Sequence, residues 1–228
     1  MKQHLPNLIT LTNLFLGCCA IVFILRGELL VGVGCLAGGA LADFLDGLVA
    51  RALGVSSPLG KELDSLADLV SFGVAPAMIL FELVGAGSWA FPVFVLAMAA
   101  GYRLAKFNLD TRQTYSFLGL PTPACTIYVA GLALIVSWAP AVVGDVVQMP
   151  VFIYANVIVL SVLLISEIPM FSFKFDQLTL KGNEIKFIFA AISLVLIVAI
   201  PIYAPSMIIA LYVGLNVVLY ARHKIVVK

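Results

Sequence analysis

Four aspartates lie inside two consecutive apolar stretches of the chain, where carboxylates are rare. Asp43 and Asp46 fall in the second apolar stretch from the N-terminus, and Asp64 and Asp68 fall in the third. A charged carboxylate at the centre of a lipid-facing helix costs about 2.5–3.5 kcal/mol. We therefore expect the four side chains to face a polar cavity and to meet a cation there.

Helical spacing allows these carboxylates to converge. Asp43 and Asp46 lie within one arc of a helix that turns about 100° per residue, and Asp64 and Asp68 share one stripe of the next helix. The linker 52–59 is short, which favours antiparallel neighbours. Ionised carboxylates this close repel one another, and hard divalent cations such as Mg²⁺ or Mn²⁺ relieve that repulsion. Two such ions about 3.5–4 Å apart form the usual clamp for displacement at phosphorus.

The composition predicts a membrane protein. The 228 residues are 63% hydrophobic and 11% charged, whereas a soluble domain carries roughly a quarter charged residues. A helix needs about 20 apolar residues to cross a bilayer. We predict an all-α transmembrane helical bundle of about eight spans, in a single domain covering residues 1–228. The spans run near 8–26, 29–53, 61–84, 88–107, 121–143, 149–167, 185–201 and 203–221.

The placement of Lys and Arg predicts the orientation. With a cytoplasmic N-terminus, all of the 13 basic residues except Arg26 fall in cytoplasmic ends or loops. Positive charge gathers on the cytoplasmic side of membrane proteins. Both termini and the polar chemistry are therefore expected on the cytoplasmic face of the cell membrane. The net charge of +1 gives no indication of a nucleic-acid partner.

The residues around the aspartates form one continuous pattern. The chain reads Asp43-x2-Asp46-Gly47-x2-Ala50-Arg51-x8-Gly60-x3-Asp64-x3-Asp68. At every fixed position this pattern resembles the signature of the CDP-alcohol phosphotransferase family, DxxDGxxARx8GxxxDxxxD. The resemblance implies a membrane core of six helices, often dimeric, which residues 1–168 would form. Residues 169–228 would then add a cytoplasmic loop and two further helices, and a homodimer stays open.

The resemblance also implies roles for individual residues. In the family, two divalent cations bridge the aspartates and the pyrophosphate of a CDP-linked donor, and the last aspartate usually acts as the general base. The implied metal ligands are Asp43, Asp46, Asp64 and Asp68, with Asp68 as the base. The small residues and the arginine of the signature lie around the CMP moiety. Candidate contacts to CDP are Gly47, Ala50, Arg51 and Gly60, with Thr10 and Asn13 near the pyrophosphate.

Further segments resemble the bacterial and archaeal branch of the family that uses serine. They are PNLIT from Pro6, SFGVAP from Ser71, GYRLAKFNLD from Gly101, FLGLPTPA from Phe117 and SFK from Ser172. The implied reaction moves a phosphatidyl group from CDP-diacylglycerol, a membrane lipid, to L-serine and releases CMP. Candidate contacts to the serine carboxylate or a phosphate are Arg103, Lys106, Asn108 and Arg112. The same basic residues could instead anchor the span at the lipid headgroups.

Three other functions stay open from the residues alone. Glycerol 3-phosphate or an inositol phosphate could replace serine as the acceptor, because the basic residues after the fourth span would also suit a phosphate. A cation transporter could use buried carboxylates, although it would not need the fixed Gly, Ala and Arg positions. A catalytically inactive structural homologue would not need all four aspartates.

Overall fold

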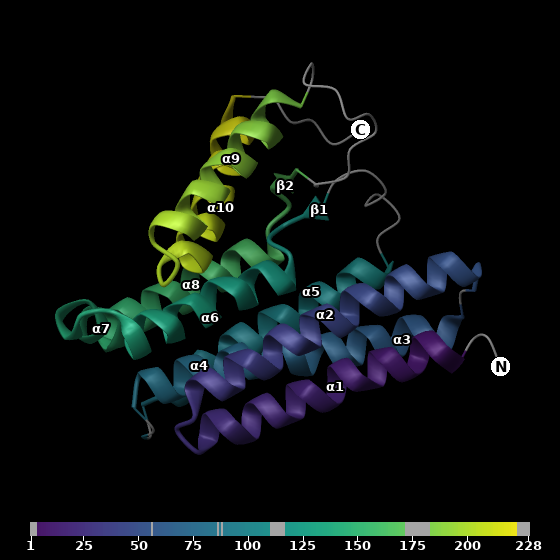
Figure 1. The fold of residues 1–228 in the computed structure, drawn as a ribbon, viewed down its shortest axis with the longest axis horizontal. Helices are drawn as coiled ribbons and strands as arrows, with labels where there is room; N and C mark the ends of the chain where they lie inside the picture. The colour runs from purple at the N-terminus through teal and green to yellow at the C-terminus, as the bar shows by residue number, and fades with distance from the viewer. Residues whose placement is uncertain are drawn as a thin grey trace.

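The computed structural model describes residues 4–55, 57–85, 87, 89–109, 117–171 and 183–222. These residues are helical almost throughout, which confirms the predicted helical class (Figure 1). In chain order the elements are α1 (His4–Leu25), α2 (Leu29–Leu53), α3 (Pro58–Asp68), the π-helical turn η1 (Leu69–Val74), α4 (Ala75–Leu83), the 3₁₀ turn η2 (Phe91–Phe94), α5 (Val95–Leu109), β1 (Phe117–Leu118), α6 (Thr122–Trp138), α7 (Ala141–Gln148), α8 (Pro150–Ile165), β2 (Pro169–Met170), α9 (Glu184–Ala199) and α10 (Ala204–Ala221).

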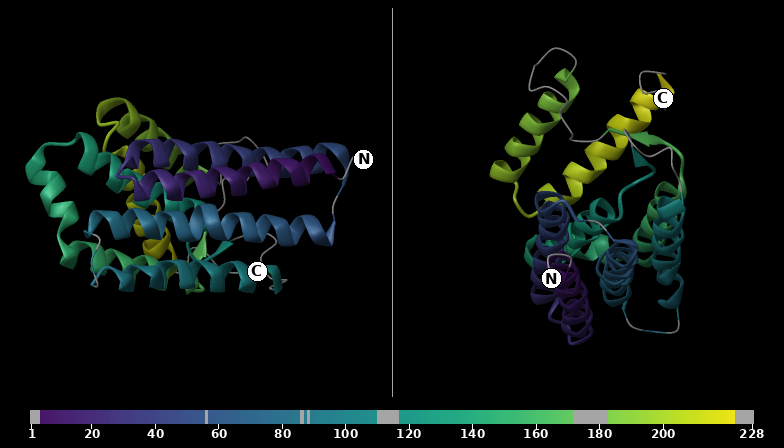
Figure 2. Two further views of the ribbon diagram at one scale, coloured as in Figure 1. Left: turned by 90° about the horizontal axis from the view of Figure 1, so that it is seen from below. Right: turned by 90° about the vertical axis from the view of Figure 1, so that its right-hand side faces the viewer.

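The N-terminal helices lie lengthwise in one bundle. Seen from below, α1 and α2 run side by side, the rod of α3 and α4 lies next to them, and α5 follows (Figure 2). The segments α3, η1 and α4 form one continuous apolar rod, Pro58–Leu83. The π turn begins directly after Asp68. Such turns are often found inside helices at functional sites.

The turn between α2 and α3 is closed at both ends by local hydrogen bonds. Gly54 adopts a left-handed conformation with φ of 63° and ends α2, where glycine avoids the strain that a Cβ would cause. Ser57 begins α3, and its hydroxyl accepts the backbone N–H of Gly60 at 3.0 Å. Pro58 occupies the first turn of the helix, where its missing N–H costs nothing. The chain thereby reverses direction between the two helices that carry the aspartates, and both helices pack against α1.

A second group of helices, α6 to α8, covers the other side of the bundle. α8 packs along α5, and α6 packs against α2 and α4. Gly119 precedes α6 with φ of +74°, and a Cβ there would lie 2.7 Å from the carbonyl oxygen of Ser166. Its N–H donates to the carbonyl of Ile168 at 2.9 Å, beside the antiparallel pair β1–β2. Glycine is therefore required where the chain enters α6.

The last two helices do not follow the direction of the bundle. Figure 1 shows α9 and α10 rising steeply above α6 and α8. α10 crosses α6 at Gly131, where an added Cβ would collide with the side chain of Ser206. The Ser206 hydroxyl donates to the carbonyl of Tyr128 at 2.9 Å. The C-terminal hairpin is thus seated on α6 through a close polar crossing.

The predicted count of eight spans is not confirmed. Among the described residues, four helices are long and apolar enough to cross a membrane, or five if the pair α7–α8, bent by 60°, counts as one span. The four are His4–Leu25, Leu29–Leu53, Pro58–Leu83 and Ala204–Ala221. α6 has 17 residues and α9 has 16, which is shorter than the roughly 20 that a perpendicular span needs.

The outer surface of the bundle is apolar, as in a membrane protein. Leu8, Phe15, Phe44, Met98 and Val151 each expose more than half of their surface. A soluble protein rarely leaves so continuous an apolar surface uncovered. The interior is closed by fully buried side chains such as those of Phe72, Leu80, Leu120, Ile153 and Leu164. Large apolar side chains therefore fill the interior of the bundle and also form an outer surface suited to lipid.

Candidate active site

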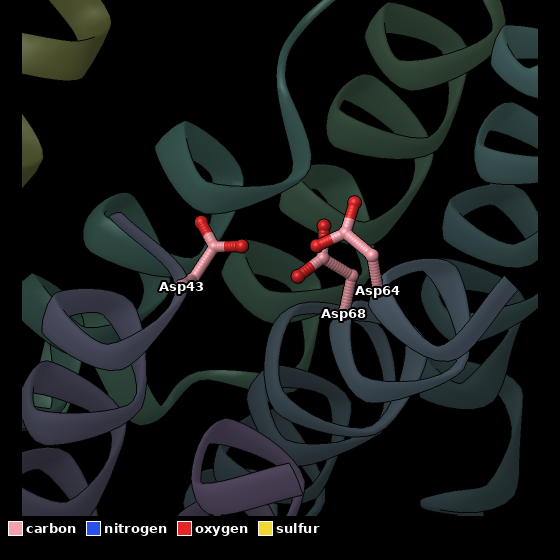
Figure 3. A group of neighbouring side chains, drawn as sticks. All are labelled: Asp43, Asp64 and Asp68. Carbon is pink, nitrogen blue, oxygen red and sulfur yellow. The ribbon is translucent and has the colours of Figure 1, made fainter. Parts of the chain in front are cut away.

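Three of the four aspartates come together between α2 and α3. One carboxylate oxygen from each of Asp43, Asp64 and Asp68 lies within 4.8 Å of the others. Figure 3 shows Asp43 reaching from α2 toward Asp64 and Asp68 on the neighbouring helix. Asp64 and Asp68 project from one stripe because four residues make about one helical turn. The convergence expected from the spacing is therefore present for three of the four carboxylates.

The fourth aspartate is held by α1. Asp46 is 7% exposed and accepts a 2.5 Å hydrogen bond from the hydroxyl of Thr10, itself buried. The same hydroxyl contacts the carbonyl of Pro6 at 3.1 Å. Asp46 lies outside the group of three but borders the same cavity as Asp43. α1 therefore fixes the direction of one carboxylate.

A second residue of α1 supports Asp68. The side-chain amide of Asn13 donates to Asp68 at 3.4 Å, and Asn13 is fully buried. The backbone carbonyl of Asn13 accepts a hydrogen bond of 3.1 Å from the hydroxyl of Ser71, which follows Asp68 by three residues. The amide oxygen of Asn13 is buried without a hydrogen-bond partner among the described residues. Such an atom is costly to leave unsatisfied; it lies beside Gly39 of α2, where an added Cβ would be 3.0 Å away, and Asn13 is not part of the cavity lining.

A cavity of about 370 Å³ opens beside the aspartates. It is bordered by residues of α1, of the helix pair and of the turn between them. These residues are Pro6, Asn7, Thr10, Asp43, Asp46, Gly47, Ala50, Val55, Ser57, Gly60, Lys61 and Asp64. Among the candidate CDP contacts, Thr10, Gly47, Ala50 and Gly60 line this cavity. Arg51 does not line it.

Small residues make room in the cavity. A Cβ added at Gly60 would lie 3.1 Å from both the amide oxygen of Asn7 and the hydroxyl oxygen of Ser57. A Cβ at Gly47 would lie 3.6 Å from a guanidinium nitrogen of Arg51. The arginine therefore lies beside the Gly47 wall even though it is not part of the lining. The absence of side chains at these positions keeps the α2–α3 turn accessible to a bulky ligand.

Sequence reasoning did not single out Lys61, Ser57 and Asn7 as site residues. Lys61 borders the cavity, and its ammonium donates to the carbonyl oxygen of Asn108 at 2.8 Å. A signal was available, because Lys61 and Asp64 are three residues apart and share one face of a helix. Asn7 belongs to the PNLIT segment named above, but its approach to Gly60 depends on how α1 packs against α3.

The predicted basic cluster is divided by the structure. Arg103 on α5 is only 8% exposed, and its guanidinium lies within electrostatic range of Asp68. Its Nε atom has no hydrogen-bond partner among the described residues. Lys106 forms an exposed ion pair with Glu167 at 2.7 Å. Arg103 is thus the member of the cluster that is turned inward.

The other two members of that cluster have different surroundings. The side-chain amide of Asn108 donates to the hydroxyl of Ser65 at 2.7 Å, which ties the end of α5 to α3. Arg112 lies outside the described residues. Among the described members of the cluster, Arg103 is the one whose charged group faces Asp68.

The carboxylate group fits hard divalent cations. Asp68 is repelled by Asp43, Asp64 and Asp46 at these distances. Oxygen ligands bind Mg²⁺ or Ca²⁺ at about 2.0–2.6 Å, so oxygens sharing one ion lie within about 4–5 Å of one another. The group of three meets this condition. The described residues offer oxygen ligands here, which Mg²⁺ and Mn²⁺ prefer over sulfur.

The fold and the site together define a helical membrane protein with a carboxylate cluster beside a nucleotide-sized cavity. The sequence profile described as CDP-alcohol phosphatidyltransferase matches residues 3–164 of the chain. The protein belongs to that family, as the aspartate signature indicated. The matched range ends in α8, so α9 and α10 lie beyond it.

Several known proteins named CDP-diacylglycerol–serine O-phosphatidyltransferase are similar to this chain. The one from Helicobacter pylori strain 26695 is 32% identical over 212 residues, covering 91% of this chain and 86% of the relative. The Bacillus subtilis protein is 34% identical over 140 residues, covering 59% and 75%. The Saccharomyces cerevisiae protein is 39% identical over 149 residues, covering 57% and 53%.

Proposed function

We propose that this protein transfers the phosphatidyl group of CDP-diacylglycerol to the hydroxyl of L-serine, giving phosphatidylserine and CMP. The observation that carries the proposal is the meeting of Asp43, Asp64 and Asp68 beside a cavity lined by the small residues of the family signature. The name of the relatives supports serine as the acceptor.

Two divalent cations, Mg²⁺ or Mn²⁺, would be held by Asp43, Asp46, Asp64 and Asp68. When bound, they would neutralise charge on the donor's pyrophosphate and on the departing CMP. The protein's own contribution is to fix the ligands in advance. Thr10 orients Asp46 from α1, and Asn13 supports Asp68 in the same way.

The donor is proposed to bind with its cytidine end in the cavity of about 370 Å³. Gly47, Ala50 and Gly60 leave the wall open, Thr10 borders the pyrophosphate end, and Arg51 stands behind Gly47. The acyl chains would remain among the apolar outer faces of the helices. Binding both substrates at the cluster makes a bimolecular reaction effectively unimolecular, which accelerates it strongly.

Asp68 is the proposed general base. Its carboxylate accepts the Asn13 side-chain amide at 3.4 Å and lies within electrostatic range of the Arg103 guanidinium. The oxygen of the serine hydroxyl attacks the phosphorus that carries diacylglycerol, and its proton passes to Asp68. The bond between that phosphorus and the pyrophosphate bridging oxygen breaks, and CMP departs with both bonding electrons.

Arg103 is the proposed contact for the serine carboxylate. A guanidinium matches a carboxylate with paired donors, and this one is buried with a nitrogen unpartnered among the described residues. Lys106 is engaged by Glu167, and Asn108 by Ser65, so the two contribute less, while Arg112 remains a candidate. A single inward guanidinium suits the one carboxylate of serine better than the dianionic phosphate of a phosphorylated alcohol.

The active site is proposed to open to the cytoplasm. The cavity lies at the turn between α2 and α3. The distribution of Lys and Arg predicts that this end of the bundle faces the cytoplasm. Serine and CMP would then exchange with the cytoplasm, while the lipid donor and product stay in the membrane.

The test is release of CMP from CDP-diacylglycerol by purified protein in lipid nanodiscs, with Mg²⁺ or Mn²⁺ and one alcohol at a time. Serine should release CMP, and both Asp64→Asn and Asp68→Asn should abolish release. Asp145→Asn is the matched control, since Asp145 is an exposed aspartate on α7. Release with glycerol 3-phosphate but not serine would overturn the acceptor. Absence of release with every alcohol would overturn the reaction.

A further inference from the structure

One residue beyond β2 is held at both ends of its backbone by α10. The N–H of Phe171 donates to the side-chain oxygen of Asn216 at 2.8 Å, and its carbonyl accepts the Tyr212 hydroxyl at 2.9 Å. Asn216 is fully buried and also donates to the carbonyl of Tyr212 at 2.8 Å. Tyr212 and Asn216 are four residues apart, so they face Phe171 from one side of the helix.

Aromatic packing strengthens this attachment. The rings of Phe171 and Tyr212 meet edge to face with centroids 5.0 Å apart. Phe189 of α9 completes the group, at 5.8 Å from Phe171 and 6.0 Å from Tyr212. Edge-to-face contacts between aromatic rings stabilise a structure beyond what burial of their surface provides. Both helices of the C-terminal hairpin therefore take part in holding Phe171.

Two sets of contacts connect Phe171 and α10 with Arg103. Phe171 follows β2, whose Pro169 pairs with Leu118 of β1. Leu118 borders the small hollow that also contains Arg103 and Phe107, whose ring centroid lies 6.0 Å from the Arg103 guanidinium carbon. More directly, the Tyr212 phenol is within electrostatic range of the Arg103 guanidinium. α10 is thus connected to the hollow around Arg103 through β2 and β1, and its Tyr212 interacts electrostatically with the arginine.

We infer that Tyr212 and Asn216 are positioning residues that hold Arg103 in the orientation needed to bind the acceptor carboxylate. The inference rests on the proposed function, because it takes Arg103 as the serine contact. The α9–α10 hairpin lies outside the range matched by the family profile. On this inference the hairpin contributes to the affinity for the acceptor. Neither residue touches a substrate; both act through the placement of Arg103.

The first experiment compares the buried Tyr212 with the half-buried Tyr128. Tyr212→Phe removes one hydroxyl at Phe171, whereas Tyr128→Phe removes a comparable hydrogen bond to Asn156, 2.6 Å long, between α6 and α8. Losing a buried hydrogen bond typically alters an equilibrium about 2- to 10-fold. Tyr212→Phe should raise the KM for serine by about that factor and leave the KM for CDP-diacylglycerol within about 2-fold. Tyr128→Phe should leave both constants unchanged.

The second experiment tests whether Tyr212 acts through Arg103. In an Arg103→Lys background, Tyr212→Phe should have no further effect on the KM for serine, because residues acting through one contact are not additive. Additive effects would overturn the inference. Asn216→Leu, which removes both side-chain hydrogen bonds, should show the same selective change in the serine KM. If Asn216→Leu does not fold, Tyr212→Phe alone decides.

The outcomes separate this inference from the proposed function. If Arg103→Lys raises the KM for serine and Tyr212→Phe does not, the inference fails and the acceptor site stands. If Tyr212→Phe changes the constants for both substrates equally, its role is structural and the inference fails. If Arg103→Lys leaves the KM for serine unchanged, the assigned acceptor contact fails and the inference fails with it, while the CMP-release test of the aspartates is unaffected.

Discussion

The hydroxyl of Thr10 on α1 donates a 2.5 Å hydrogen bond to the carboxylate of Asp46 on α2. Thr10 is 4% exposed and Asp46 is 7% exposed, so this contact fixes a buried carboxylate that would otherwise choose among several rotamers. α1, which carries no residue of the aspartate signature, therefore controls the geometry of the cluster.

Thr10→Val should weaken metal binding without changing the fold. Valine keeps the branched shape but leaves the Asp46 carboxylate without this donor, and partners of metal ligands typically affect affinity about 10- to 100-fold. The metal concentration for half-maximal CMP release should rise by about that factor, with kcat at saturating metal largely kept. Thr12→Val is the control, because the exposed Thr12 hydroxyl donates to the carbonyl of Leu8 in its own helix, at 2.9 Å, and has no other hydrogen bond among the described residues. An unchanged metal dependence in Thr10→Val would contradict the prediction.

Metal binding itself should be visible as stabilisation. A ligand that binds only the folded state increases the free energy of unfolding, by about 2.7 kcal/mol when the free ligand is at 100 times its Kd. The unfolding temperature rises as a result. Mn²⁺ should raise the Tm of the wild-type protein, and EDTA should reverse the shift and abolish activity. Asp43→Asn should lose most of the shift, because Asp43 belongs to the group of three carboxylates. Asp145→Asn should keep it. An equal shift in both variants would place the metal elsewhere.

The pairing of the aspartates followed from the sequence because it depends on local geometry. The interval between Asp64 and Asp68 sets one stripe of a helix, and a linker closed by Gly54 and Ser57 leaves the two helices antiparallel. These relationships need no knowledge of distant packing. The Thr10–Asp46 contact joins residues 36 apart in sequence and depends on how α1 packs, although Thr10 itself could be suspected from its place at the start of the first span.

The direction of α9 and α10 could not be predicted by counting apolar residues. Hydropathy gives the length and polarity of a segment but not its angle to its neighbours. That angle depends on tertiary contacts such as Ser206 with Tyr128 and Phe171 with Asn216. In the same way, the basic residues were predicted as one cluster. Lys106 instead pairs with Glu167, which is 61 residues away in sequence, and so has different surroundings from Arg103.

Gly119→Ala should destabilise the fold strongly. The backbone φ of +74° disfavours any side chain, and the new Cβ would approach the carbonyl oxygens of Ser166 and Leu164 to 2.7 and 2.8 Å. Strain combined with a clash against backbone places the loss of unfolding free energy at about 2–4 kcal/mol. Thermal unfolding in detergent measures it. Gly214→Ala is the control, since a Cβ there meets nothing within 4 Å, and alanine in a helix should be neutral or slightly stabilising. Equal Tm values for the two variants would contradict the role of Gly119.

Substitutions of Arg103 and Lys106 should have different effects on the KM for serine, although the two residues lie three apart on α5. Arg103→Lys keeps the charge but loses the planar pair of donors, so the KM for serine should rise about 10-fold or more, as expected for loss of a charge-assisted hydrogen bond. Lys106→Ala breaks an ion pair whose partners are 32% and 56% exposed. Exposed pairs of this kind contribute about 0–1 kcal/mol, so the KM for serine should stay within about 2-fold. Initial rates at varied serine and saturating CDP-diacylglycerol measure both. A larger effect from Lys106→Ala than from Arg103→Lys would move the acceptor contact to the surface of the bundle.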